Sequence, residues 1–96
     1  MRQLYRYDIK KNAKLIIQRG IGFDEIIAAI DSDDLIETRP HHNQYKYPNQ
    51  QIMYVECSDE VYMVPYVIEK DGTLFLKTLF PSKKARKEFT KRNKDE

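Results

Sequence analysis

A helical rhythm broken by a glycine, over residues 7–25, constrains the fold of this chain more than any other stretch. Its first half predicts a helix over about 9–19, with Asp8 as the N-cap and Arg19 at the end, before a glycine. The apolar positions have the spacing of one buried stripe: Ile9, Ala13, Ile16, Ile17 and Gly20. A second helix over about 23–31 has a stripe of its own: Phe23, Ile26, Ile27 and Ile30.

The middle of the chain predicts strands. Short turn-forming connections separate three of them, which are Gln51–Cys57, Glu60–Glu69 and Thr73–Phe80. An Asp-Gly pair in the second connection is typical of a hairpin, so we expect an antiparallel meander, with Leu35–Thr38 as a brief fourth strand. Pro65 cannot donate a hydrogen bond inside its strand and should lie at a bulge or an edge. The polar segment from Arg39 to Gln51 is predicted to be a loop.

The C-terminal end predicts one more helix. Ser82, after Pro81, is placed as the N-cap of a helix over about 83–92. Ala85 and Phe89 are its only apolar positions, so it should pack lightly and fray from about residue 92. We therefore expect one α+β domain over 1–96: two N-terminal helices, an antiparallel meander of three to four strands and a short C-terminal helix.

Charge is distributed unevenly along the chain. The formal charge is only +2, but residues 1–20 hold six basic residues against one acidic residue, and residues 82–96 hold seven against three. Residues 21–37 hold six acidic residues and no basic one. Two basic segments on one face would create a positive potential that the net charge conceals. The acidic stretch could bind a basic partner or only balance the first helix.

Cysteine content and hydropathy exclude several classes of protein. Cys57 is the only cysteine, so no disulfide within the chain is possible and a zinc site of the usual kind is not expected. Adjacent histidines on an extended segment point apart and chelate poorly, so we expect no metal and no other cofactor. No apolar run is long enough to cross a bilayer and no signal-peptide pattern is present, so we expect a cytoplasmic protein without membrane contact.

Short motifs near both ends resemble those of a known family. They are Asp-x-x-Lys-Asn at 8–12, Arg-Gly-Ile at 19–21, Phe-Asp-Glu at 23–25 and Ser82-Lys83-Lys84-Ala85 with Arg86. Together they are similar to the motifs of the BrnT-type toxins, although Gly22 stands where that family usually has a serine cap. A related family of small domains of uncharacterised function has the same helix–helix–sheet layout.

The resemblance implies a RelE-like fold and a ribonuclease toxin of a type II toxin–antitoxin pair. RNA would be the substrate. The partner would be a cognate antitoxin, such as a ribbon–helix–helix repressor, and the toxin would contact operator DNA only through the complex with that antitoxin.

One loop gathers the residue types that metal-free RNA cleavage needs. The reaction requires a base for the ribose 2′-hydroxyl, an acid for the leaving 5′-oxygen and cations for the phosphate. Histidine, with a pKa of about 6.5, can take either proton-transfer role, so His41 and His42 are candidates with Lys46 beside the phosphate. Stacking on bases and pairing with phosphate predict three RNA contacts: Arg39, Tyr45 and Tyr47. The alternative is an ordinary polar loop.

A second group of candidates opens the last helix. Cations in a first helical turn oppose the dipole, and together with free N–H groups they can hold a phosphate. The residues concerned are Ser82, Lys83, Lys84 and Arg86. The alternative is a solvated basic tail. Lys77 is the one charge inside its strand, where alternation places it on a face with Phe75 and Leu79, either at the rim or beside the scissile phosphate.

Two hypotheses follow. The leading one is a metal-independent endoribonuclease toxin that cleaves RNA by 2′-hydroxyl attack, on a sheet surface where both groups of candidates meet. The alternative is a non-catalytic interaction domain of the same fold, which binds a partner protein or nucleic acid without cutting it. Coordinates that separate the two histidines from the Ser-Lys-Lys segment would argue against the shared site.

Overall fold

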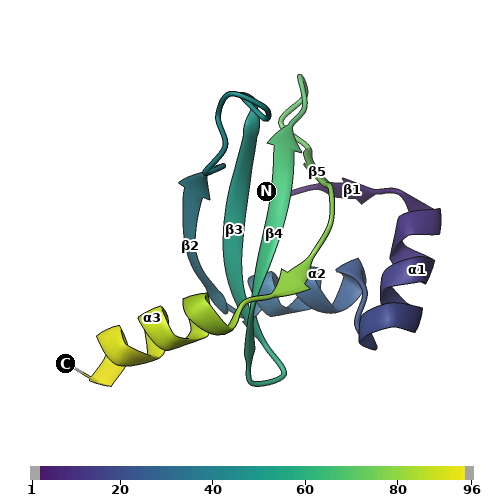
Figure 1. Cartoon of the computed structure of the whole chain (residues 1–96). Helices are drawn as coiled ribbons and strands as arrows, with labels where there is room; N and C mark the ends of the chain where they lie inside the picture. The colour runs from purple at the N-terminus through teal and green to yellow at the C-terminus, as the bar shows by residue number, and fades with distance from the viewer. Residues whose placement is uncertain (1–2, 95–96) are drawn as a thin grey trace.

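A computed structural model describes residues 3–94, with side chains as far as residue 89. Three helices surround a six-stranded sheet with the strand order β1-β5-β4-β3-β2, in which β6 pairs with β4 (Figure 1). In chain order the elements are β1 (Tyr5–Tyr7), α1 (Ile9–Arg19), α2 (Phe23–Asp31), β2 (Leu35–Pro40), β3 (Gln50–Cys57), β4 (Glu60–Ile68), β5 (Leu74–Leu76), β6 (Phe80–Pro81) and α3 (Lys83–Lys94).

The α+β class and the antiparallel centre of the sheet agree with the sequence analysis. Strands β2, β3, β4 and β5 are antiparallel neighbours, as the short connections predicted. The expected three to four strands are too few, because β1 pairs in parallel with β5 and β6 adds a short pairing to β4. The two N-terminal helices consequently lie between β1 and β2 rather than ahead of the sheet. β1 is too short for a periodic pattern and its partner lies near the other end of the chain, so neither periodicity nor a turn signals this pairing.

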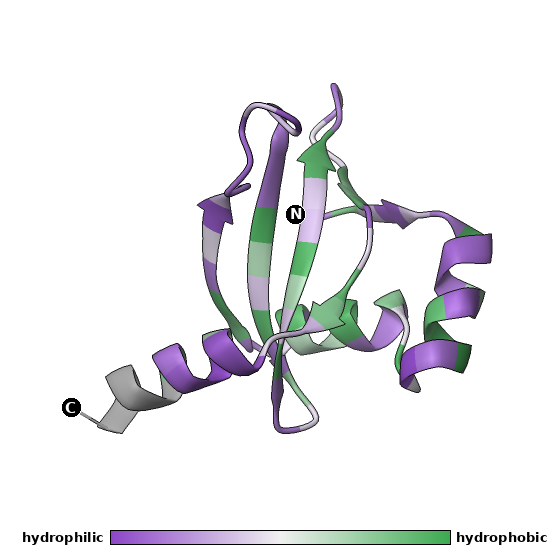
Figure 2. Ribbon diagram, in the orientation of Figure 1, coloured by the Kyte–Doolittle hydropathy of each residue, from purple (hydrophilic) through white to green (hydrophobic). Residues whose placement is uncertain are grey.

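Different helices cover the two faces of the sheet, with α2 behind the strands and α3 in front of them (Figure 1). The larger core, on the α2 side, contains Leu15, Ile21, Phe23, Ile26, Ala29, Met53, Val55, Tyr62, Val64, Tyr66, Leu76 and Leu79. The smaller core, under α3, contains Ile52, Tyr54, Val61, Ala85 and Phe89. Alternate residues of β3 and β4 enter the two cores, which explains why these strands are apolar on both faces (Figure 2).

Both ends of α1 are as predicted, and the start of α2 depends on α1. The Asp8 carboxylate accepts the first free N–H groups of α1, and Gly20 ends the helix in the left-handed conformation, with φ 74°. At the next helix Gly22 has no side chain to cap with. The Phe23 N–H therefore donates to Asn12 Oδ1 on α1, at 2.7 Å.

The predicted buried stripe of α1 is wrong. Ile9 and Ile17 are 80% and 85% exposed, and Ala13 and Ile16 are exposed too. Leu15 is instead the buried residue of this helix. The reason is the position of α1, which stands at the edge of the molecule past β1 and meets the remainder of the chain through one narrow side (Figure 1).

Pro65 lies inside the central strand β4, at neither the edge strand nor the bulge that the sequence predicted, but the strand beside it is interrupted there. On one side it pairs with Ile52 of β3. On the other side the Pro65 carbonyl accepts the Lys77 N–H at 2.8 Å. The N–H that proline lacks is not needed on this side, because β5 has ended and an irregular segment over 77–79 follows it. The continuous strand expected over Thr73–Phe80 is therefore split into β5 and β6.

The last helix extends two residues beyond its predicted end. Ser82 is its cap, as predicted, since the Ala85 N–H donates to Ser82 Oγ at 3.1 Å. Ala85 and Phe89 are buried against the sheet, also as predicted. The expected fraying towards the C-terminus concerns in part residues 95–96, which lie outside the described residues.

Candidate nucleic-acid interface

Two rows of residues cross the α3 side of the sheet. One of them, row A, lies past the part of the strands that α3 covers, and the other, row B, runs into the core under α3. Row A follows the strand register and one backbone hydrogen bond, through Arg6, Phe75, Val67, Gln50 and His41. Row B lies beside it and contains Lys77, Pro65, Ile52 and Arg39. Because neighbouring strands lie about 4.8 Å apart, row A extends over about 19 Å.

At one end of these rows, two cations lie over a part-exposed aromatic ring. The Arg6 guanidinium carbon is 5.9 Å, and the Lys77 ammonium 5.3 Å, from the centroid of the Phe75 ring. Both cations are exposed, although Arg6 also forms an ion pair with Glu69 at 3.3 Å. This group joins β1, β5 and the irregular segment after β5 on one face of the sheet.

The sequence identified part of this group. Alternation correctly placed Lys77 on a face with Phe75, but Leu79 is buried in the core on the other face because the chain leaves the sheet after β5. Arg6 was not singled out, since only the parallel pairing of β1 with β5 brings it to Phe75. The uneven basic charge of residues 1–20 was the sole signal that pointed towards it.

At the other end of row A, residues of the loop between β2 and β3 stack on one another. The His41 ring lies 4.5 Å from His42 and 4.6 Å from Tyr47, between centroids. The Lys46 ammonium lies 5.3 Å from the centroid of Tyr47. The structure thus gathers four of the predicted residues, while Tyr45 is 99% exposed at the surface of the loop.

His41 is buried and its hydrogen bonds hold the loop. Its ring Nδ1 accepts the Asn43 backbone N–H at 3.0 Å. The His41 backbone N–H donates to the Gln50 carbonyl, also at 3.0 Å. Burial, and then the neighbouring His42, lower the pKa of the His41 imidazole, which favours the neutral form with the proton on Nε2. Because its lone pair at Nδ1 is occupied, His41 is poorly placed to act as a base. The exposed imidazole of this loop is that of His42.

Arg39 links β2 to α3. Its guanidinium is paired with Glu88 and Glu37, and these hydrogen bonds raise its pKa above the usual range. The same group lies 5.0 Å from the centroid of the Tyr54 ring and 5.4 Å from that of Phe89. Arg39 therefore holds the last helix on the sheet instead of offering its charge to a phosphate.

The basic residues that open α3 lie away from the histidines. The Ser82 N–H donates to the Val61 carbonyl, and Val61 pairs with Glu56, whereas His41 bonds to Gln50. Positions 50 and 56 are about 20 Å apart along β3. A single site that unites His41 and His42 with Ser82, Lys83, Lys84 and Arg86 is therefore not formed. Lys77 is likewise separated from His41, by about three strand spacings, or about 14 Å.

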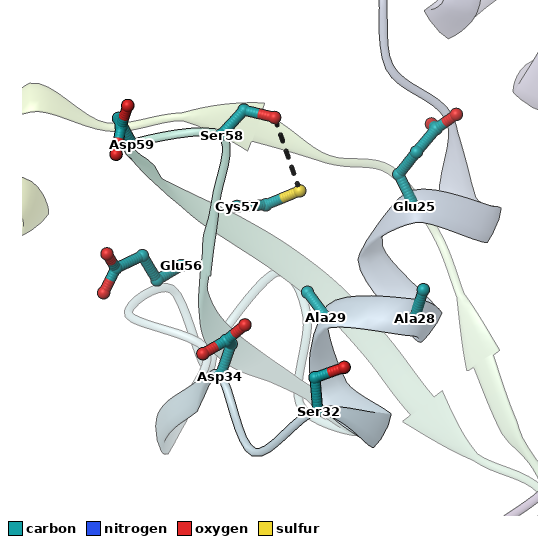
Figure 3. Close-up of a pocket in the computed structure, with 9 residues that line it drawn as sticks. All are labelled: Glu25, Ala28, Ala29, Ser32, Asp34, Glu56, Cys57, Ser58 and Asp59. Carbon is teal, nitrogen blue, oxygen red and sulfur yellow. Dashed lines mark hydrogen bonds between the residues drawn. The ribbon is translucent and has the colours of Figure 1, made fainter.

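An acidic hollow of about 460 Å³ lies beside the turn between β3 and β4. Four acidic residues are among those that line it: Glu25, Asp34, Glu56 and Asp59 (Figure 3). Such a concentration of negative charge repels phosphate. The hollow is thus unsuited to nucleic acid, in contrast to the Arg6–Lys77 end of the rows.

Among residues 3–94, no group of three His, Cys, Asp or Glu side chains converges in a way that could hold a metal ion. Within the same part of the chain, no helix is long and apolar enough to cross a bilayer. No family model, curated protein or solved structure matches this chain. The likeness to BrnT-type toxins therefore depends on the short motifs alone.

Proposed function

We propose that this protein binds single-stranded RNA along row A, with a base against Phe75 and phosphates beside Arg6 and Lys77. The observation that carries the proposal is the placement of two exposed cations over one part-exposed ring. Proteins that bind single strands with little sequence preference combine aromatic rings, on which bases stack, with cations that follow the backbone. Arginine and lysine both pair with phosphate oxygens.

The course of row A supports an extended ligand. From Phe75 the row passes the part-exposed side chains of Val67 and Gln50 and reaches the loop that exposes His42 and Tyr45. Its length of about 19 Å is enough for several nucleotides, since single-strand sites of small domains take about four or more. RNA along this row would stay clear of the acidic hollow at the other end of β3.

We also propose that the protein has a RelE-like fold and acts as the toxin of a toxin–antitoxin pair. Two helices precede the antiparallel strands β2 to β5 and a basic helix ends the chain, and this order supports both proposals, as do the motifs at both ends of the chain. In that setting the partner is an antitoxin that silences the RNA-binding face, and operator DNA is contacted through the antitoxin complex.

Fluorescence anisotropy with a labelled single-stranded RNA tests the site. Arg6→Gln together with Lys77→Gln should weaken binding and lower the slope of log K against log salt by about 1.4, since each phosphate contact on a single strand contributes about 0.7. Phe75→Ala should remove about 1–3 kcal/mol of stacking free energy.

Matched variants separate the site from general charge effects. Lys10→Gln with Lys14→Gln removes the same charge from α1 and should leave the salt slope unchanged. Glu69→Gln should tighten binding, because it frees Arg6 from its ion pair. If the Arg6 and Lys77 substitutions have no effect while Lys83→Gln with Lys84→Gln abolishes binding, RNA lies on α3 and the proposal is wrong.

Cleavage of the bound RNA is a second candidate function. One observation favours it: the loop keeps the His42 imidazole exposed in the same stack of rings that carries Lys46. His42 would then transfer a proton and Lys46 would stabilise the charged phosphate. On this hypothesis pure protein cleaves a defined RNA in EDTA, and His42→Ala abolishes the cleavage. If the RNA is bound but stays intact, the protein is a non-catalytic binding domain.

A further inference from the structure

α1 carries an exposed apolar stripe, of which one edge, Ile16, also packs against Gly22 at the start of α2. Ile16, Ile9, Ala13 and Ile17 lie within an arc of about 100° around the helix, at 100° per residue, and over about 12 Å of its length. All four side chains are exposed. Single exposed isoleucines are ordinary on a protein surface, whereas several along one helical stripe are typical of a surface that binds a partner.

One edge of this stripe is basic. Lys10 and Lys14 follow Ile17 around the helix, four residues apart, and both are exposed. Neither forms an ion pair with any residue over 3–94, the described part of the chain. Asp8, the acidic residue nearest in sequence, is engaged as the cap of α1. The stripe therefore offers apolar surface beside two cations that have no internal partner in the described structure.

We infer that this stripe binds an amphipathic helix of another protein, with apolar residues at helical spacing and carboxylates four residues apart along one edge. Such a helix covers the isoleucines and brings its carboxylates to Lys10 and Lys14, whose spacing they match. A second copy of this chain is disfavoured, because its own stripe has the same basic edge. Three isoleucines on one short helix bury too little apolar surface to hold the protein on a membrane.

Two synthetic peptides of about 20 residues, long enough to be helical, provide the test. They have the same leucine stripe and differ along one edge, which has glutamate in one peptide and lysine in the other. Anisotropy of the labelled peptides with the whole chain should give at least about tenfold tighter binding of the glutamate peptide. Lys10→Glu with Lys14→Glu should reverse this preference.

Substitutions in the stripe complete the test. Ile9→Ser with Ile17→Ser should weaken peptide binding by at least about tenfold, without lowering the Tm, because both side chains are exposed. Ile68→Ser is the matched control, since Ile68 is an exposed isoleucine on β4 and should not affect binding. Arg6→Gln with Lys77→Gln should bind the peptide normally, which separates this inference from the RNA site.

Three outcomes would overturn the inference. The first is an absence of saturable binding of the glutamate peptide to folded wild-type protein, or binding that ignores the Ile9 and Ile17 substitutions. The second is binding to phosphatidylserine vesicles, and not to the peptide, through the same isoleucines. The third is a concentration-dependent dimer that the isoleucine substitutions dissociate, which would assign the stripe to a second copy of the chain.

Discussion

Asn12 supplies from α1 the hydrogen-bond acceptor that the first turn of α2 lacks. Its Oδ1 accepts the Phe23 N–H, and it occupies the space that a side chain at Gly22 would need. A Cβ at position 22 would lie 2.5 Å from Asn12 Oδ1 and 2.8 Å from Cγ1 of Ile16. The cap of α2 therefore comes from Asn12, a residue of the neighbouring helix, and not from the residue at the N-cap position itself.

Gly22→Ser should therefore destabilise the protein, although serine is a good N-cap. The added Cβ collides with Asn12 and Ile16, and overpacking of this kind costs about 1–3 kcal/mol. The midpoint of urea unfolding measures the change. The double variant Asn12→Ala with Gly22→Ser should lose less unfolding free energy than the two single variants lose together, because removal of the Asn12 side chain makes room for the serine. A Gly22→Ser variant more stable than the wild type would contradict this account.

His41 should make the protein less stable below neutral pH. Its pKa is lowered in the folded state, so the unfolded chain binds the proton more readily and stability falls as the pH drops below about 6.5. His41→Gln should reduce the loss of Tm between about pH 7.5 and pH 5.5 relative to the wild type. His42→Gln, a substitution at the exposed neighbour, should retain most of that loss, because burial is the larger cause of the lowered His41 pKa. Equal pH dependence in the wild type and the His41 variant would show that this imidazole is not the cause.

At the scale of elements, local signals predicted where helices begin and end better than which side they bury. Asp8, Gly20 and Ser82 act through the nearest turns of backbone, so their roles are readable from the sequence. The buried side of a helix depends on its neighbours. α1 meets the molecule through the narrow side that holds Leu15, and its wider apolar stripe stays exposed. A hydrophobic period alone cannot distinguish an inward stripe from one kept for a partner.

Leu15→Ala and Ile17→Ala should therefore differ sharply. Leu15 is 2% exposed within the larger core, so its truncation should cost about 2–5 kcal/mol in the free energy of unfolding. Ile17 is exposed, so its truncation should change that free energy by no more than about 0.5 kcal/mol. Chemical denaturation of the two variants measures both values. Similar losses of unfolding free energy for the two variants would indicate that Ile17 is buried, as the sequence predicted.

At the scale of the whole molecule, topology decides which candidate residues meet. The loop residues His41, His42, Lys46 and Tyr47 were predicted together and lie together, because they are close in sequence. The expected union with Ser82 fails, since the register from Gln50 to Glu56 places the two groups at different ends of β3. The contact of Arg6 with Phe75 was not foreseen, because it arises from a parallel pairing between distant segments.

An NMR titration of the ¹⁵N-labelled protein with a short single-stranded RNA would show whether RNA lies along row A. If RNA binds there, the first amide signals to shift should be those of Arg6, Val67, Phe75 and Lys77, followed by those of the loop that carries His42. Shifts confined to the start of α3 or to the acidic hollow, with row A unchanged, would contradict binding along row A.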